Sequence, residues 1–336
     1  MLTLPATIIL TDHTASPTSP LTLVANDMQE VDKVIGQRLI SSVPLVAQIS
    51  QYIIAAGGKR LRPAMLLMVC GALGYEGMHR FSLAAVVELI HTATLLHDDV
   101  VDASTMRRGR ATANETFGNP ASVLVGDFLH SRSFQMMVDA GSMRIMEILS
   151  QATNVIAEKK ENQLINIHDA SLDEAGYLRV IRSKTAKLFE ASARIGAVLA
   201  QSDPVIEEAC ATYVQALGTA FQIIDDVLDY DGDATEMGKN LGDDLREGKS
   251  TLPLIAAMQR GTPAQTQIVR HAIEQGSTEQ LTEIVGIVRA TGALEVTRAA
   301  AFSEARRAMS AAEQLPVNAY SSGLRELAAQ LLERRN

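Results

Sequence analysis

Apolar residues recur with helical spacing along most of the chain, starting near Asn26. In the stretch "NDMQEVDKVIGQRLI", Asn26 is a cap-like residue, and the apolar positions that follow share one helical face: Met28, Val31, Val34, Ile35 and Leu39. The stretch "SLAAVVELIHTATLLHDDVVD" begins at Ser82, a favoured N-cap residue. Its length and apolar content predict a buried helix.

The remaining pattern also predicts helices rather than strands. We expect them at residues 120–139, 142–168, 172–200, 204–230, 250–260, 262–275, 278–291, 294–314 and in a last segment ending near 334. Loops are expected at the Gly- and Pro-containing breaks "AAGGKRLRP", "RRGRATANETFGNP" and "DYDGDATEMGKNLGDDLREGKS". Residues 1–25 mix Thr, Ser and Pro and predict a flexible extension. The sequence therefore predicts an all-α protein with one large helical domain over residues 26–336 and antiparallel helices.

Composition and charge exclude several classes of protein. The chain has 336 residues, 47% hydrophobic, with a net charge of −9, which argues against a general nucleic-acid binder. No apolar run reaches the roughly 18 residues of a membrane span. The first 32 residues lack Lys and Arg, which argues against a signal or transit peptide. Cys70 and Cys210 lie in apolar surroundings, so we expect buried thiols and a cytoplasmic location.

Two acidic motifs end apolar helical runs. The first, "DDVVD", contains Asp98, Asp99 and Asp102, and the second, "DDVLD", contains Asp225, Asp226 and Asp229. Carboxylates four residues apart share a helix face, repel each other and oppose the helix dipole, so a cation is needed. Carboxylate oxygens suit Mg²⁺, and neither motif resembles a calcium-binding EF-hand loop. One such motif alone is most often a solvated helix end, but two with matching apolar lead-ins favour a metal site.

Basic residues lie in loops near the ends of the same helices. They are Lys59, Arg60 and Arg62 in "GGKRLRP", Arg107, Arg108 and Arg110 in "MRRGR", Lys184 beside Thr185, and Lys239 and Lys249 after the second acidic motif. Each alone is typical of a solvated surface, but their alternation with the acidic motifs favours phosphate binding. His91, two turns before Asp98, is either a core histidine or a donor to the same phosphates. The ligand predicted by this pattern has an anionic head and a hydrocarbon tail.

These motifs, in this order and spacing, resemble those of the trans-prenyl diphosphate synthase family from about residue 26 to the C-terminus. The segments "HTATLLHDDVVD", "RRGRATAN", "SVLVGDFL" and "GTAFQIIDDVLDY" are most similar to its bacterial octaprenyl-forming branch. The resemblance implies an isoprenoid synthase-like bundle around a central cavity, and a homodimer. It implies Mg²⁺-dependent condensation of isopentenyl diphosphate with an allylic primer, farnesyl diphosphate. The implied product is octaprenyl diphosphate, the precursor of a quinone side chain.

The resemblance also implies roles for individual residues. Two to three Mg²⁺ ions, with Mn²⁺ as a possible substitute, would be held on the allylic diphosphate by Asp98, Asp99, Asp102, Asp225, Asp226 and Asp229. The diphosphate of isopentenyl diphosphate would be bound by Lys59, Arg62, His91 and Arg108. The allylic diphosphate would be bound by Arg107, Lys184, Thr185, Gln222 and Lys239. Among these, the catalytic residues would be Asp98, Asp99, Asp102, Asp225, Asp226, Lys184 and Lys239.

Product length is expected to depend on the helix before Asp98. The family's short-chain members carry a bulky aromatic residue near Ala93 and Thr94, so small residues here imply an open tunnel and a longer product. Deeper candidates for its floor are Phe134, Met136 and Met137, for which ordinary core packing is an equal alternative. The run "IAEKKENQLINI" departs from the family by placing Lys159, Lys160 and Asn162 where small or apolar residues are usual. If these residues line the tunnel, they alter product length, and if they face solvent, they are neutral.

Three alternatives remain open at this point. One is a prenyl synthase of another product length, such as geranylgeranyl, heptaprenyl or solanesyl. Another is a class I terpene cyclase, which the 4% aromatic content and the absence of Trp disfavour, because cyclases hold cations with aromatic rings. The third is a non-catalytic regulatory subunit, which usually loses one acidic motif, whereas this chain keeps both.

Overall fold

The computed structural model describes residues 19–55, 58, 60–107, 109–166, 168–184, 186–231 and 242–333. The chain divides into two compact units, which we describe separately. Unit 1 contains Met1–Ile148, Ile195–Ser202 and Asn318–Tyr320, and unit 2 contains Leu149–Arg194, Asp203–Val317 and Ser321–Asn336. Apart from one short hairpin, the elements of the described residues are helices, so the predicted all-α class is confirmed.

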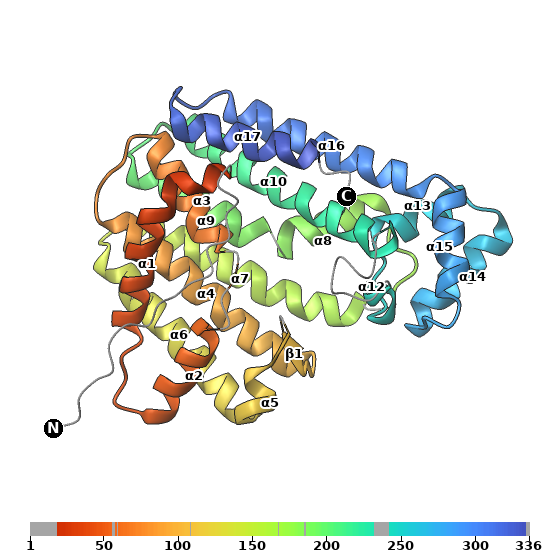
Figure 1. Ribbon diagram of the computed structural model, residues 1–336, viewed down its shortest axis with the longest axis horizontal. Helices are drawn as coiled ribbons and strands as arrows, with labels where there is room; N and C mark the ends of the chain where they lie inside the picture. The colour runs from red at the N-terminus through yellow and green to blue at the C-terminus, as the bar shows by residue number, and fades with distance from the viewer. Residues whose placement is uncertain are drawn as a thin grey trace. The chain divides into compact units, whose positions relative to one another are not determined.

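Unit 1 contains the first half of the elements in chain order. They are the 3₁₀-helix η1 (Pro20–Val24), α1 (Ala25–Arg38), α2 (Pro44–Ala55), α3 (Leu61–Ala72), α4 (His79–Val101), strands β1 (Met106–Arg107) and β2 (Arg110–Ala111), α5 (Ala113–Phe117) and α6 (Asn119–Asp139). Helix α4 packs along α6 and also contacts α1 and α3 (Figure 1). Because α4 is apolar on most of its surface, it forms the buried centre of this unit.

Unit 2 is built around a pair of long helices, α10 (Pro204–Asp231) and α16 (Ala293–Ala312), which lie side by side (Figure 1). The others are α8 (Glu174–Lys184), α12 (Asp243–Arg246), α13 (Leu252–Arg260), α14 (Pro263–Gln275) and α15 (Leu281–Ala290). Three helices have residues in both units: α7 (Met143–Asn166), α9 (Ala186–Leu199) and α17 (Ala319–Glu333). The α10 core includes Tyr213, whose hydroxyl donates a hydrogen bond of 2.7 Å to the Leu324 carbonyl.

Two predicted helix starts were wrong. Ser82 lies inside α4, where its hydroxyl donates to the His79 carbonyl, because the helix begins three residues earlier at His79. Asn26 lies inside α1, which begins at Ala25 directly after η1. In both cases, a neighbouring turn extends the helix beyond the polar residue that could have capped it. The predicted apolar face of α1 is confirmed at Met28, Val31, Ile35 and Leu39, which are buried, whereas Val34 is half-buried.

Other differences concern segments without a long apolar period. The predicted helix 172–200 contains α8 and α9, on either side of Thr185, which lies outside the described residues. Helices α2 and α3 occupy segments where the sequence predicted no helix. The short helices α5 and α12 lie within predicted loops. Residues 1–18 of the predicted extension lie outside the described residues, whereas Pro20 and Val24 of η1 are buried.

Two further expectations from the sequence can be compared with the structure. Cys70 and Cys210 are both buried and form no disulfide, which confirms the predicted thiols. Among the described residues, none of the helices combines the length and hydropathy that crossing a bilayer requires.

Candidate active site

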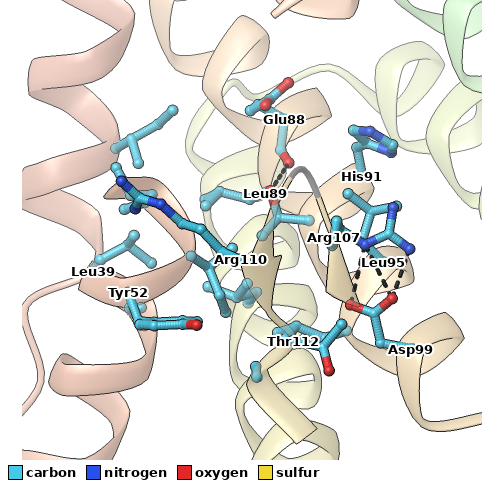
Figure 2. A pocket seen from close by; sticks show the side chains of 18 of the residues that line it. Leu39, Tyr52, Glu88, Leu89, His91, Leu95, Asp99, Arg107, Arg110 and Thr112 are labelled. Carbon is cyan, nitrogen blue, oxygen red and sulfur yellow. Dashed lines mark hydrogen bonds and ion pairs between the residues drawn. The ribbon is translucent and has the colours of Figure 1, made fainter. Parts of the chain in front are cut away.

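A pocket in unit 1 lies among α1, α2, α4, the β-hairpin, α5 and α6 (Figure 2). Its apolar wall is formed mainly by Ile35, Leu39, Ile53, Ile54, Leu89, Leu95, Leu96 and Leu129. Its polar lining includes Arg60, Glu88, His91, Thr92, Asp99, Arg107, Arg110 and Thr112. An apolar cavity with a few converging charged groups is the usual form of a small-molecule site.

The second aspartate of the first motif is bound by an arginine of the hairpin. Arg107 donates from Nε to Asp99 Oδ1 and Oδ2 at 3.0 and 3.2 Å, and from Nη2 to Oδ1 at 2.6 Å (Figure 2). The Asp99 side chain points into the pocket and is only 4% exposed. Asp98 is half-buried and Asp102, at the C-cap of α4, is exposed. The three carboxylates of this motif therefore have different surroundings, because successive helical residues point about 100° apart.

The hairpin holds its arginines beside α4. Arg107 and Arg110 are partners across β1 and β2, and Gly109, with φ +73°, allows the tight turn between them. The Tyr52 hydroxyl of α2 donates to the Ala111 carbonyl at 2.6 Å, which ties the hairpin to α2. These contacts place two guanidinium groups in the lining of one pocket.

Several predicted site residues of this unit can be placed. His91, Asp99 and Arg107 come together in the pocket, and Arg62 lies in the first turn of α3. Lys59 and Arg108 lie outside the described residues. The predicted product-length residues Ala93, Thr94, Phe134, Met136 and Met137 are not among those that line this pocket. Ala93, Met136 and Met137 are buried, and the Thr94 hydroxyl donates to the His91 carbonyl.

The second acidic motif, in unit 2, follows the same arrangement. Asp226 is 3% exposed, and it accepts hydrogen bonds from the Tyr177 hydroxyl at 2.6 Å and from Gln222 Nε2 at 3.0 Å. Burial, with the nearby Asp244 carboxylate, raises the pKa of Asp226 to about 7. Burial and the same Asp226 contact raise the pKa of Tyr177, so its hydroxyl stays protonated and donates.

The other carboxylates of this motif differ in exposure. Asp225 is exposed, whereas Asp229 is half-buried and accepts a bond from the Asp244 backbone N–H at 3.3 Å. Burial raises the pKa of Asp229 to about 6, and the Asp244 carboxylate adds to this shift. Lys249 Nζ lies 3.0 Å from Asp244 Oδ1 and partly balances this cluster. Thr185, Lys239 and the side chain of Lys184 lie outside the described residues.

The chemistry of the acidic motifs fits a hard divalent cation. Their side chains offer only carboxylate oxygens, which Mg²⁺ and similar ions prefer. Asp102 and Asp225 are open to solvent, while Asp99 and Asp226 are engaged by protein donors. Among the residues that the structure describes, no three His, Cys, Asp or Glu side chains form a group that could hold a metal by itself.

Three polar residues of these sites were not predicted as site residues. Glu88 and Asp244 sit among the charged groups, and Tyr177 binds Asp226 from 49 positions earlier in the chain. Asp244 is the second aspartate of "GDDLREGK", two positions after Gly242, and this paired acidic motif is a signal that the sequence does contain. Tyr177 occupies an ordinary helical position in "EAGYLRVI", so no local pattern marks it.

Comparisons with known proteins agree on one family. The family model described as Polyprenyl synthetase matches residues 43–288. The chain is 50% identical over 313 residues to the octaprenyl diphosphate synthase of Escherichia coli (strain K12), covering 93% of this chain and 97% of that protein.

Solved structures give the same result. A decaprenyl diphosphate synthase from Rhodobacter capsulatus matches with a TM-score of 0.89 and 43% identity, over 94% of this chain and 98% of that one. A polyprenyl synthase from Caulobacter crescentus CB15, complexed with calcium and isoprenyl diphosphate, matches with a TM-score of 0.87 and 43% identity, over 94% of this chain and 97% of that one.

Proposed function

The chain belongs to the polyprenyl synthetase family, and from this premise we propose that it elongates farnesyl diphosphate with isopentenyl diphosphate to all-trans octaprenyl diphosphate. The observation that carries the proposal is the 50% identity, over nearly the whole chain, with an octaprenyl diphosphate synthase. The expected use of the product is a quinone side chain. Nonaprenyl and decaprenyl products are the nearest alternatives, because relatives with those names are 44% and 43% identical.

We assign the acidic motifs to divalent metal ions on the allylic diphosphate. Asp98, Asp102 and Asp225 are the proposed direct ligands, supported by their oxygen chemistry and by a relative crystallised with calcium and isoprenyl diphosphate. Asp99 and Asp226 are assigned a supporting position next to these ligands and not on the metal itself, since each carboxylate already accepts hydrogen bonds from protein donors. When bound, Mg²⁺ supplies charge stabilisation to the leaving diphosphate.

The basic residues are assigned to the two diphosphates. Arg107 keeps its Nε and Nη2 on Asp99, so the allylic diphosphate would approach its Nη1 side. Lys184, Thr185, Gln222 and Lys239 complete this group in the proposal, and Lys59, Arg62, His91 and Arg108 take the isopentenyl diphosphate. Arg forks match diphosphate oxygens and stabilise the negative charge that grows as the allylic C–O bond ionises.

The chemical step then needs orientation and the exclusion of water. The double bond of isopentenyl diphosphate attacks the allylic cation, and a proton is lost from the new intermediate to the departing diphosphate. No side chain acts as a nucleophile. The leucine and isoleucine wall beside His91 keeps water from the cation, which would otherwise be quenched.

One assay tests the proposed function. The purified protein is incubated with Mg²⁺, farnesyl diphosphate and labelled isopentenyl diphosphate, and the dephosphorylated product is sized by chromatography. We expect the eight-unit product as the main species. A main product of nine or ten units would replace the octaprenyl assignment by its nearest alternative. A cyclic hydrocarbon, or no elongation at all, would refute the proposal.

We also propose a homodimer and a cytoplasmic location. The dimer is supported by apolar side chains exposed on α6, with Leu124 at 66% and Val138 at 65%. The location is supported by the two cysteines, which remain thiols as is usual in a reducing compartment.

A further inference from the structure

An ion-paired arginine separates two residues proposed to bind isopentenyl diphosphate. Arg60 lies between Lys59 and Arg62 in the sequence and directly precedes α3. Its Nη2 is 3.5 Å from Asp32 Oδ1 on α1, and its Nη1 is 3.4 Å from Glu88 Oε1 on α4. The three side chains are nearly buried, with 10% to 13% of their surface exposed. One guanidinium therefore joins the start of α3 to two other helices.

The backbone of Arg60 has a conformation that is unusual for a residue with a side chain. Its φ and ψ are +48° and +31°, in the left-handed region, which costs free energy for any residue except glycine. Its carbonyl accepts the bond from the Ala64 N–H at 3.1 Å, so this strained residue starts the helix that carries Arg62. Such conformations persist where the surroundings fix them, and the two ion pairs provide that constraint.

The charges around Arg60 argue against a direct role in binding the substrate. One positive guanidinium faces two carboxylates, so the group formed by Arg60, Asp32 and Glu88 carries a net negative charge. A cation that recognised a diphosphate would need charge not already balanced by protein carboxylates. The ion pairs are therefore better suited to holding the segment in place.

We propose that Arg60 is a positioning residue: through Asp32 and Glu88 it clamps the start of α3, which carries Arg62, and so sets the affinity for isopentenyl diphosphate. This inference rests on the proposed function. It concerns one of the two substrates, because the clamped segment carries Arg62, assigned to isopentenyl diphosphate, and no residue assigned to the allylic diphosphate.

Two substitutions test the clamp, because a purely electrostatic effect and a positioning role predict changes of opposite sign in the KM for isopentenyl diphosphate. Asp32→Asn and Glu88→Gln each remove a negative charge near an anionic substrate, and by electrostatics alone the KM for isopentenyl diphosphate would fall. If the clamp positions the start of α3, the same variants raise this KM by about tenfold, which corresponds to about 1.4 kcal/mol of binding free energy. The KM for farnesyl diphosphate does not rise, because the allylic diphosphate is assigned to Arg107 and to other residues outside the start of α3.

Asp27→Asn is the matched control. Asp27 also lies on α1 and pairs with an arginine of α4, Arg80, whose Nε is 3.3 Å from Asp27 Oδ2. This pair does not touch the Arg60 segment, so neither KM should change. Thermal unfolding checks that each variant is folded, and if Asp32→Asn does not fold, Glu88→Gln carries the test.

A KM for isopentenyl diphosphate that falls or stays constant in the folded variants would overturn the clamp, as would an equal rise in Asp27→Asn. The wild-type measurement separates the two proposals. If wild-type protein forms no polyprenyl product, the proposed function fails, whereas an active wild type with insensitive variants refutes only the role of Arg60.

Discussion

The second aspartate of each acidic motif is the buried one, and each is held by a donor from another element. Asp99 is bound by Arg107 and Asp226 by Tyr177, whereas Asp102 and Asp225 are exposed. The two donors differ in charge: Arg107 is a cation, while Tyr177 is a neutral hydroxyl. Burial, with the Asp244 carboxylate, raises the pKa of Asp226 to about 7 although the Tyr177 hydrogen bond lowers it, so the ionisation of Asp226 can be followed in the stability of the protein.

Removing the Tyr177 hydroxyl should destabilise the metal-free protein in a pH-dependent way. The hydroxyl favours the charged form of Asp226, so its loss matters above pH 7, where that carboxyl is ionised, and matters less below. In EDTA, we expect Tyr177→Phe to lower the unfolding free energy by about 1–3 kcal/mol at pH 8.5 and by clearly less at pH 5.5. Denaturant unfolding at both pH values measures the difference.

Tyr213→Phe is the control for this prediction. The Tyr213 hydroxyl is also buried and donates at 2.7 Å, but its acceptor is the neutral carbonyl of Leu324. We expect its cost to be the same at both pH values. A pH-independent cost for Tyr177→Phe would contradict the raised pKa of Asp226.

The same raised pKa values predict how metal-free stability changes with pH. For Asp226 and Asp229 the folded pKa values, about 7 and about 6, exceed the ordinary value of 3.8, so the folded state binds more protons between these limits. Their contribution to stability is therefore present at pH 4 and lost as the pH rises through the folded values. In EDTA, Asp226→Asn should gain stability relative to wild type between pH 4 and pH 8, measured by urea unfolding. An unchanged difference over this range would show an ordinary pKa.

At the scale of elements, close helix packing can be tested with two glycines. A Cβ at Gly196 of α9 would lie 3.0 Å from Val69 Cβ and 3.1 Å from the Leu66 carbonyl oxygen, both on α3. We expect Gly196→Ala to destabilise the protein by about 1–3 kcal/mol, because backbone must move. Gly36 of α1 has no atom within 4 Å of its Cβ position, so Gly36→Ala should stabilise by about 0.5–1 kcal/mol. Thermal unfolding of both variants compares the signs, and equal signs would refute the packing argument.

A substitution on helix α4 also tests what sets the length of the product. Ala93 is buried and small, and we expect Ala93→Tyr to shorten the main product because the ring would obstruct the proposed tunnel. His79→Tyr, at the exposed start of the same helix, serves as the control and should leave product length unchanged. Chromatography of the dephosphorylated products measures both, and an unaltered product from Ala93→Tyr would exclude this tunnel assignment.

The sequence predicted the elements in which burial produces a long run of apolar residues with helical spacing. It did not predict the short elements, or the contacts between residues far apart in the chain. Helices α4 and α10 were found because their apolar runs are long, although Ser82 did not mark the start of α4. The hairpin was missed since two-residue strands leave no periodic signal. At the candidate site, the spacing of the motifs predicted the aspartates and arginines. The pairing of Tyr177 with Asp226 was not predicted, because it depends on the packing of two helices and leaves no local sequence motif.

For the whole molecule, the proposed dimer gives a direct prediction. Leu124→Glu and Val138→Glu on α6 place charges on an exposed apolar face, so we expect them to shift the protein toward the monomer. Val205→Glu on α10 changes a side chain that is likewise 65% exposed, and it should leave the assembly unchanged. Size-exclusion chromatography with light scattering measures the mass, and a dimer that persists in both α6 variants would place the interface elsewhere.

The β-hairpin sets two like charges opposite each other, since Arg107 and Arg110 are cross-strand partners. Their mutual repulsion costs free energy, and the Asp99 carboxylate that accepts from Arg107 lowers this cost. An anion bound beside both guanidinium groups would lower it further, so part of the anion's affinity would come from relief of this repulsion rather than from new contacts. Binding of the substrate and the stability of this hairpin would in this way be thermodynamically coupled.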